Sequence, residues 1–194
     1  MKTDLREAKK ERRRQIAAAL AGLSAEKRAA DSARICAQLR EFPAWRQARW
    51  VLLFAPMPEE PDIWPLLAEA LAASKIAALP RFNRHTRGYA AARVQSLPED
   101  VAVGHYGIRE PVTRCPPLAL SGFDLILVPG VAFDSRGGRL GHGKGYYDRL
   151  LSSVRGVKCG VAFTEQLAGE IPVGPADVRM NFVVTPEGCA KCGT

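Results

Sequence analysis

The chain has 194 residues and a mass of 21.1 kDa, which is the size of one ordinary domain. Its 47% hydrophobic and 25% charged residues exclude a disordered chain, and no apolar run is long enough to span a bilayer. The 28 basic and 20 acidic side chains leave a net charge of +8. This excess indicates an anionic partner: nucleic acid, a membrane surface, or a phosphorylated or carboxylated small molecule.

Five cysteines at irregular spacing, with no apolar stretch before Ile16, favour a reducing cytoplasm over a disulfide framework. Cys189 and Cys192 form a CxxC motif without a second pair of ligands nearby. A structural zinc site needs four ligands. We therefore expect residues 187–194 to be a loose tail outside the single domain, which covers residues 1–186.

Hydrophobic patterning predicts helices over the first 42 residues, broken near Gly22, with Ser24 as the cap of the second helix. From Trp50 onward, strands alternate with helices. The expected strands cover 50–54, 75–79 (ended by Pro80), 89–94, 123–128, 157–163 and 182–185, and the expected helices cover 63–73 and 146–154. This alternation predicts an α/β fold with a mostly parallel open sheet covered on both faces. Ligands of such sheets bind at the carboxyl ends of the strands.

Two strand ends carry charged side chains. Residues 57–62 contain three carboxylates, which can cap the next helix through Asp62, bind a cation, or accept hydrogen bonds from a ligand. Arg81 follows the second strand and is a candidate only because it lies on the ligand edge.

The fourth strand leads into five glycines between Gly137 and Gly145, and a helix follows. Closely spaced glycines before a helix expose backbone N–H groups, which favours an anion site. Arg139 and Lys144 add positive charge, and Asp148 can hold Mg²⁺. Gly138 to Lys144 fit the P-loop pattern, but that assignment is disfavoured because Gly145 stands where the motif has Ser or Thr.

Near the N-terminus, Lys2, Arg6, Lys9 and Arg13 share one face of the first helix. This basic face is either exposed to solvent or has its tip in contact with an anionic ligand. Nucleic-acid binding has little support, because no aromatic residue interleaves with the cluster. Asp177 near the last strands is either a second metal carboxylate or a turn residue.

The segment LILVPGVAFDSRGGRLGHGKGYYDR resembles the signature of the 5-formyltetrahydrofolate cyclo-ligase (methenyltetrahydrofolate synthetase) family. Further matches occur in the family's order and bring the coverage to residues 2–186. They are Lys2-x-x-Leu5-Arg6, Pro58-x-Glu60-x-Asp62, Leu79-Pro-Arg81, Gly107-Ile-x-Glu-Pro111, Ala162-Phe-x-x-Gln166 and Ile171-Pro with Asp177.

The resemblance implies a three-layer α/β/α fold like that of ribose-phosphate isomerases and CoA-transferases. It implies a carbon–nitrogen ring-forming ligase that uses ATP and Mg²⁺ to convert 5-formyltetrahydrofolate to 5,10-methenyltetrahydrofolate. Phosphorylation of the formyl oxygen would precede ring closure. A cytoplasmic monomer that binds neither nucleic acid nor membrane is expected.

The resemblance also implies the site residues. Arg139, Lys144 and Tyr147 would be catalytic, and Asp148 and Asp177 would bind Mg²⁺. The folate would meet Phe54, Met57, Glu60, Gly143, Lys144, Gly145 and Tyr146. The nucleotide would meet Lys2, Arg6, Arg139, Leu140, Gly141, His142, Gly143, Lys144, Gly145, Tyr146 and Tyr147.

One position departs from the family pattern. Asn181 stands where many relatives have Asp, and an amide cannot carry negative charge. The alternative reading is therefore a non-catalytic nucleotide- or folate-binding homologue of the same fold.

Overall fold

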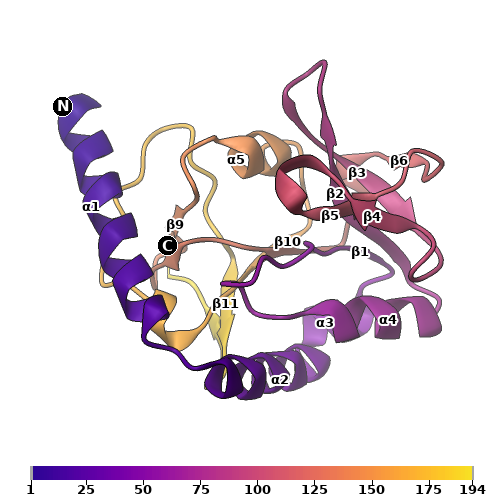
Figure 1. Cartoon of the computed structure of the whole chain (residues 1–194), viewed down its shortest axis with the longest axis horizontal. Helices are drawn as coiled ribbons and strands as arrows, with labels where there is room; N and C mark the ends of the chain where they lie inside the picture. Colours follow the sequence, from indigo (N-terminus) through magenta and orange to yellow (C-terminus); the bar gives the residue numbers. More distant parts are fainter. Residues whose placement is uncertain (1, 194) are drawn as a thin grey trace.

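A computed structural model describes residues 2–193, with the side chains of residues 5–105 and 107–193. Its centre is an eight-stranded sheet in the order β12-β11-β10-β7-β1-β2-β3-β6 (Figure 1). Its strands are β1 (Trp50–Leu52), β2 (Ile76–Asn83), β3 (Gly88–Val94), β6 (Pro117–Leu118), β7 (Leu125–Val128), β10 (Val157–Val161), β11 (Phe182–Thr185) and β12 (Gly188–Lys191). The run from β11 to β2 is parallel, and the outer strands β12, β3 and β6 are antiparallel. The predicted mostly parallel sheet is confirmed.

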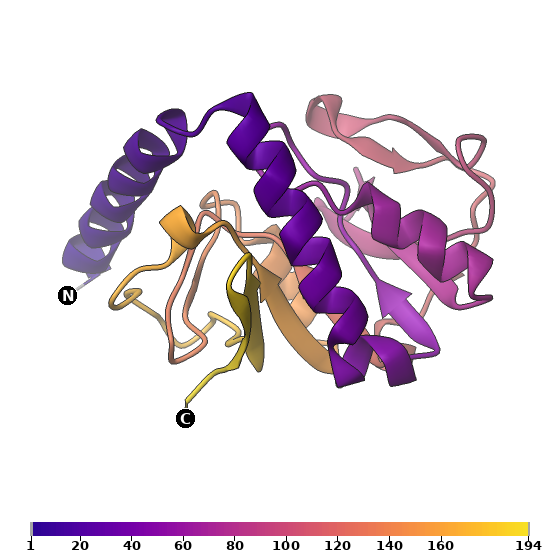
Figure 2. The same cartoon turned by 90° about the horizontal axis from the view of Figure 1, so that it is seen from below.

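Helices cover both faces of the sheet, and Figure 2 shows α2 crossing one of these faces in front of the strands. Neighbouring strand residues point to opposite faces: Val51 packs with Ile35 of α2, whereas Leu52 packs with Leu150 of α5. The three-layer α/β/α arrangement is thereby confirmed. The helices are α1 (Lys2–Ala21), α2 (Ala25–Glu41), α3 (Pro43–Gln47), α4 (Trp64–Ala72) and α5 (Tyr146–Leu151).

The first two helices begin and end close to where the sequence predicts. α1 ends at Ala21, directly before Gly22, and the Ser24 side chain caps α2 by accepting a hydrogen bond from the Lys27 N–H at 3.2 Å. Ile16 and Leu20 anchor the end of α1 in the core. The N-terminal half of α1 is thereby held beside the carboxyl ends of the strands.

The expected end of the second strand at Pro80 is wrong, because β2 continues to Asn83. The ladder between β1 and β2 ends at the Leu52–Ala78 pair, so beyond Ala78 the strand pairs only with β3. A proline is tolerated where one side of a strand has no ladder to donate to.

The expected loose tail is also wrong for residues 188–191. They form β12, which pairs antiparallel with β11 from the Phe182–Lys191 pair to the Thr185–Gly188 pair. These four residues are too few to show a strand period, and the two-residue turn at Pro186 and Glu187 brings them back along β11.

The remaining strands form two short hairpins beside the sheet. β4 (Val101–Val103) pairs with β5 (Arg109–Pro111), and β8 (Ala132–Phe133) pairs with β9 (Arg139–Leu140). Short 3-10 turns cover His105–Gly107, Leu120–Gly122 and Thr164–Gln166. Among the described residues, no helix combines the length and apolar character required to cross a membrane.

Candidate active site

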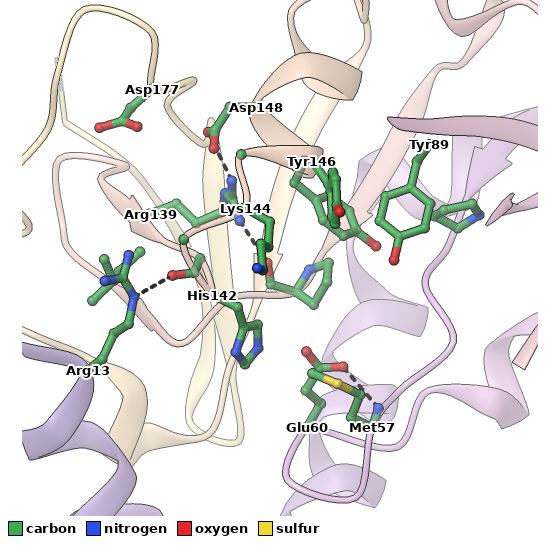
Figure 3. Close-up of a pocket in the computed structure, with 18 of the residues that line it drawn as sticks. Arg13, Met57, Glu60, Tyr89, Arg139, His142, Lys144, Tyr146, Asp148 and Asp177 are labelled. Atoms are coloured by element: carbon green, nitrogen blue, oxygen red, sulfur yellow. Dashed lines mark hydrogen bonds and ion pairs between the residues drawn. The ribbon is translucent and has the colours of Figure 1, made fainter. Parts of the chain in front are cut away.

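A pocket of about 950 Å³ lies at the carboxyl ends of the central strands (Figure 3). Ala55 and Met57 line it after β1, Pro80 lines it from β2, and Pro129 and Gly130 line it after β7. This is the edge where the predicted α/β topology places a ligand. Seven basic side chains and four carboxylates line the pocket, so it is electropositive.

The glycine-rich segment forms the β8–β9 hairpin and the loop that leads into α5. The carboxylate of Asp134 shapes the hairpin by accepting hydrogen bonds from the Gly138 N–H at 2.7 Å and the Ile171 N–H at 2.8 Å. Gly143 has a φ of 92° and Gly145 one of 65°, a region that side chains disfavour. The backbone therefore turns tightly along the pocket wall, and we call residues 139–147 the glycine loop.

Arg139 is the first residue of the glycine loop. Its side chain lies against the rest of the loop and is only 3% exposed. Its Nη2 forms an ion pair with Oδ1 of Asp148 at 2.9 Å, and its guanidinium lies over the Tyr147 ring, 5.6 Å from the centroid. Its buried Nε has no hydrogen-bond partner among the described residues. The loop thus rests on a guanidinium whose charge Asp148 largely balances.

Helix α1 brings further cations to the pocket. Arg6, Lys9 and Arg13 line it, which places the predicted basic face of the helix against the site. Nε of Arg13 donates to the Gly141 carbonyl at 2.8 Å, and Nζ of Lys9 lies 2.5 Å from Oδ2 of Asp177. The side chain of Lys2 lies outside those that the structure describes.

The two predicted metal carboxylates, Asp148 and Asp177, both line the pocket and are each paired with a cation. Desolvation alone would raise the pKa of Asp177, but hydrogen bonds from Lys9 and the Gly174 N–H outweigh it and lower that pKa. Asp177 is therefore held as an anion. No cluster of three or more metal-ligating side chains occurs among the residues that the structure describes.

Glu60 and Met57 lie across the pocket from the glycine loop (Figure 3). Oε2 of Glu60 accepts a hydrogen bond from the Met57 N–H at 3.0 Å. Burial nevertheless raises the pKa of Glu60 to about 7, with a further contribution from the charge of Glu59. Phe54, expected beside Met57, lies 2% exposed in the core and does not line the pocket, because it packs on the α2 side of the sheet.

His142 and Tyr147 complete the middle of the pocket. Desolvation lowers the pKa of His142, and the nearby charges of Arg13 and Arg139 lower it further. Burial raises the pKa of Tyr147 well above its usual range. Both side chains are therefore neutral near pH 7.

Several lining residues could not be found from sequence spacing. Tyr89 of β3 lies against Tyr146, with 5.4 Å between the ring centroids, and Ile108 and Glu110 come from the β5 region. The motif Gly107-Ile-x-Glu-Pro111 was a sequence signal for this segment, but it carried no role. The contact between β3 and the glycine loop depends on the fold alone.

Other singled-out residues support the structure outside the pocket lining. Gln166 donates to the Gly130 carbonyl at 2.7 Å, and Nη1 of Arg81 donates to the Val112 carbonyl at 2.9 Å. Oδ1 of Asn181 accepts a hydrogen bond from the Lys158 N–H at 2.9 Å. The departure at Asn181 therefore lies directly before β11, outside the pocket lining, in a contact with β10.

Comparison with known proteins decides the family. A family model described as the 5-formyltetrahydrofolate cyclo-ligase family matches residues 5–186. The chain belongs to the 5-formyltetrahydrofolate cyclo-ligase family. The expected resemblance is confirmed, and so is the expectation of an enzyme of the cyclo-ligase class.

Relatives in this cyclo-ligase family match along most of the chain. The 5-formyltetrahydrofolate cyclo-ligase of Mus musculus is 28% identical, over 95% of this chain and 96% of its own. The probable 5-formyltetrahydrofolate cyclo-ligase of Schizosaccharomyces pombe is 32% identical, over 80% of this chain and 84% of its own.

Solved structures agree with the cyclo-ligase fold. The 5,10-methenyltetrahydrofolate synthetase of Aquifex aeolicus, solved by NMR, has a TM-score of 0.85 and 35% identity, and the match covers 96% of this chain and 93% of that one. A 5,10-methenyltetrahydrofolate synthetase from Mycoplasma pneumoniae, with a TM-score of 0.73 and 21% identity, supports the fold alone.

Proposed function

We propose that the protein converts 5-formyltetrahydrofolate to 5,10-methenyltetrahydrofolate and uses ATP and Mg²⁺, with release of ADP and phosphate. The observation that carries the proposal is that one pocket joins a cationic glycine loop to a second wall with Met57, Glu60 and Tyr89. Its volume of about 950 Å³ lies at the upper end of the range for small-molecule sites. Such a pocket suits two ligands held side by side.

The glycine loop is the proposed triphosphate site. Its backbone N–H groups and the start of α5 favour an anion, and Lys144 is an exposed cation on the loop. Gly143 and Gly145 have positive φ values, at which a residue with a side chain would be strained. Because glycine has no side chain, a ligand can approach the backbone closely at these two positions. Arg139 supports the loop from beneath.

The opposite wall is the proposed pterin site. A pterin ring presents N–H donors, and the Glu60 carboxylate can accept them. Met57 and Tyr89 offer apolar and aromatic surface beside it. A formyl group between the two walls would face the loop that holds the phosphates.

The residues present fit a magnesium ion that is shared with the nucleotide. Oδ2 of Asp148 and Oδ1 of Asp177 accept no hydrogen bond from the described residues. Magnesium is usually bound through one or two carboxylates together with substrate phosphates. When bound, the ion would supply positive charge to the phosphates.

The proposed chemistry activates a poor electrophile. The formyl oxygen attacks the γ-phosphorus, and the bond to ADP breaks. The neighbouring N10 of the folate then attacks the formyl carbon and loses its proton, and the carbon–oxygen bond breaks to release phosphate. The chain's task is to hold the reacting atoms in line and to stabilise negative charge, so no nucleophilic side chain is required.

Mixing the protein with Mg²⁺, ATP and 5-formyltetrahydrofolate tests the proposal. We expect the absorbance band of the methenyl product to rise, together with one ADP per product. Omission of ATP is the control. Absence of product with a protein whose circular dichroism shows it to be folded would refute the proposal.

A further inference from the structure

Residues 141–143 of the glycine loop lie between two guanidinium groups. A Cβ atom at Gly141 would lie 2.9 Å from Nη1 of Arg139, and one at Gly143 would lie 3.5 Å from Nη2 of Arg13. The two arginines reach the loop from different parts of the fold, Arg139 from β9 and Arg13 from α1. Figure 3 shows Arg13 joined to the loop through the Gly141 carbonyl.

The charges of these cations are not equally available to a ligand. Arg139 is paired with Asp148 at 2.9 Å, and Lys9 is paired with Asp177 at 2.5 Å. Arg13 forms no ion pair with the described side chains, and both of its Nη groups lack a hydrogen-bond partner among them. Arg13 therefore presents a full positive charge and unused donors beside the loop.

The side chain of Arg13 is also held in place before any ligand arrives. Its Nε donates to the Gly141 carbonyl at 2.8 Å, which fixes the plane of the guanidinium. Desolvation lowers the pKa of Arg13, in keeping with a partly buried position. A planar, prepositioned guanidinium with two unused Nη groups is suited to bind phosphate oxygens in a bidentate manner.

We propose that Arg13 binds the terminal phosphates of the nucleotide from the α1 side of the glycine loop. This assignment rests on the proposed ATP-dependent function and adds a binding residue beyond those that the family resemblance implied on α1, which were Lys2 and Arg6. Helix α1 would then contribute to nucleotide affinity through Arg13 as well as through its tip.

Nucleotide binding in the presence of Mg²⁺ and without folate tests the role of Arg13. Calorimetry would compare ATP, ADP and AMP for the wild type and for Arg13→Gln, Arg13→Lys and Arg14→Gln. We expect Arg13→Gln to weaken ATP binding about tenfold or more, because a hydrogen-bonded charge pair is lost. AMP binding should change little, and Arg13→Lys should recover part of the ATP affinity by keeping the charge.

Arg14→Gln is the matched control. Arg14 lies next to Arg13 on the same helix, but its side chain is 75% exposed and pairs with Glu11. It should bind all three nucleotides as the wild type does. Its unaltered affinity would show that a loss at Arg13 does not come from net charge alone.

Two results would overturn the assignment while leaving the proposed function in place. One is wild-type ATP affinity in Arg13→Gln. The other is an equal loss for ATP and AMP, which would mean that Arg13 only tethers the loop to α1. If the folded wild type shows neither ATP binding nor turnover, the proposed function itself fails, and the assignment fails with it.

Discussion

Lys9 and Asp177 form an ion pair across the mouth of the pocket, with 2.5 Å between Nζ and Oδ2. Their side chains are only 18% and 20% exposed, and the two residues are 168 positions apart in the chain. This pair connects the first helix to the loop before the last parallel strand. It therefore ties the cationic helix to the wall that carries the second proposed metal carboxylate.

Lys9→Met should lower the free energy of unfolding by about 1–2 kcal/mol at pH 7, since a partly buried carboxylate loses its partner. The lowered pKa of Asp177 contributes stability above the ordinary Asp pKa, and that contribution is lost as the pH falls through the folded-state pKa. The difference from the wild type should therefore shrink toward pH 3. Urea unfolding at several pH values measures it.

Arg14→Met provides the comparison for this prediction. The Arg14–Glu11 pair is short, at 2.6 Å, but its side chains are 75% and 49% exposed. Exposed pairs contribute little, so we expect the free energy of unfolding of this variant to stay close to that of the wild type. Equal losses in the two variants would contradict the importance of burial at Lys9.

Asp148→Asn should destabilise the fold by about 2–3 kcal/mol, because it leaves the buried guanidinium of Arg139 without its counter-charge. Thermal and urea unfolding both report the loss. Glu69→Gln is the control, since the Arg40–Glu69 pair is equally direct but 42% and 41% exposed. A similar small effect in both variants would show that Arg139 does not depend on Asp148.

Glu60→Gln should change how stability depends on pH. The folded-state pKa of Glu60 is raised to about 7, so ionisation between about pH 5 and pH 8 works against the folded state. The variant should gain roughly 1–3 kcal/mol relative to the wild type as the pH rises through this range. Glu59→Gln should reduce this pH dependence only slightly, because the charge of Glu59 contributes less to the raised pKa than burial does. A flat difference for Glu60→Gln would disprove the raised pKa.

Lys144→Ala should lower turnover by about a hundredfold or more without altering the far-UV circular dichroism, because the proposed phosphate site would lose a cation. Lys191→Ala, on the exposed part of β12, should retain wild-type turnover. Unchanged turnover in Lys144→Ala would argue against a phosphate role for that side chain.

The layers of the fold could be predicted because each parallel strand is a short apolar run with a helix before or after it. Gly22 and Ser24 marked the first helix boundary through local backbone preferences, and the structure agrees. Pro80 misled the prediction because its effect on a strand depends on whether a second neighbour is present. The strand β12 was missed because its pairing with β11 is set by the sheet and not by its own composition.

The site could be predicted where it lies on one continuous segment. The glycine loop was found because its glycines and cations follow a buried strand and precede a helix. Glu60 was singled out through the family resemblance. Tyr89 could not be placed, because its position depends on β3 folding back over the glycine loop. Phe54 and Met57 were both expected beside the folate, but Met57 lines the pocket and Phe54 is buried in the core. The sequence around them does not determine which of the two side chains faces the pocket.

The pocket is formed by segments that lie far apart in the sequence, helix α1 at one end and the loops around Gly141 and Asp177 at the other. This separation affects when, during folding, the protein becomes able to bind a ligand. Helix α1 is synthesised first, yet Lys9 and Arg13 find their partners only at Asp177 and Gly141. Contacts between such distant segments close large loops at a cost in entropy, so we expect them to form late in folding. A partly folded chain therefore presents a basic helix without a pocket, and the capacity to hold a nucleotide arises together with the completed sheet.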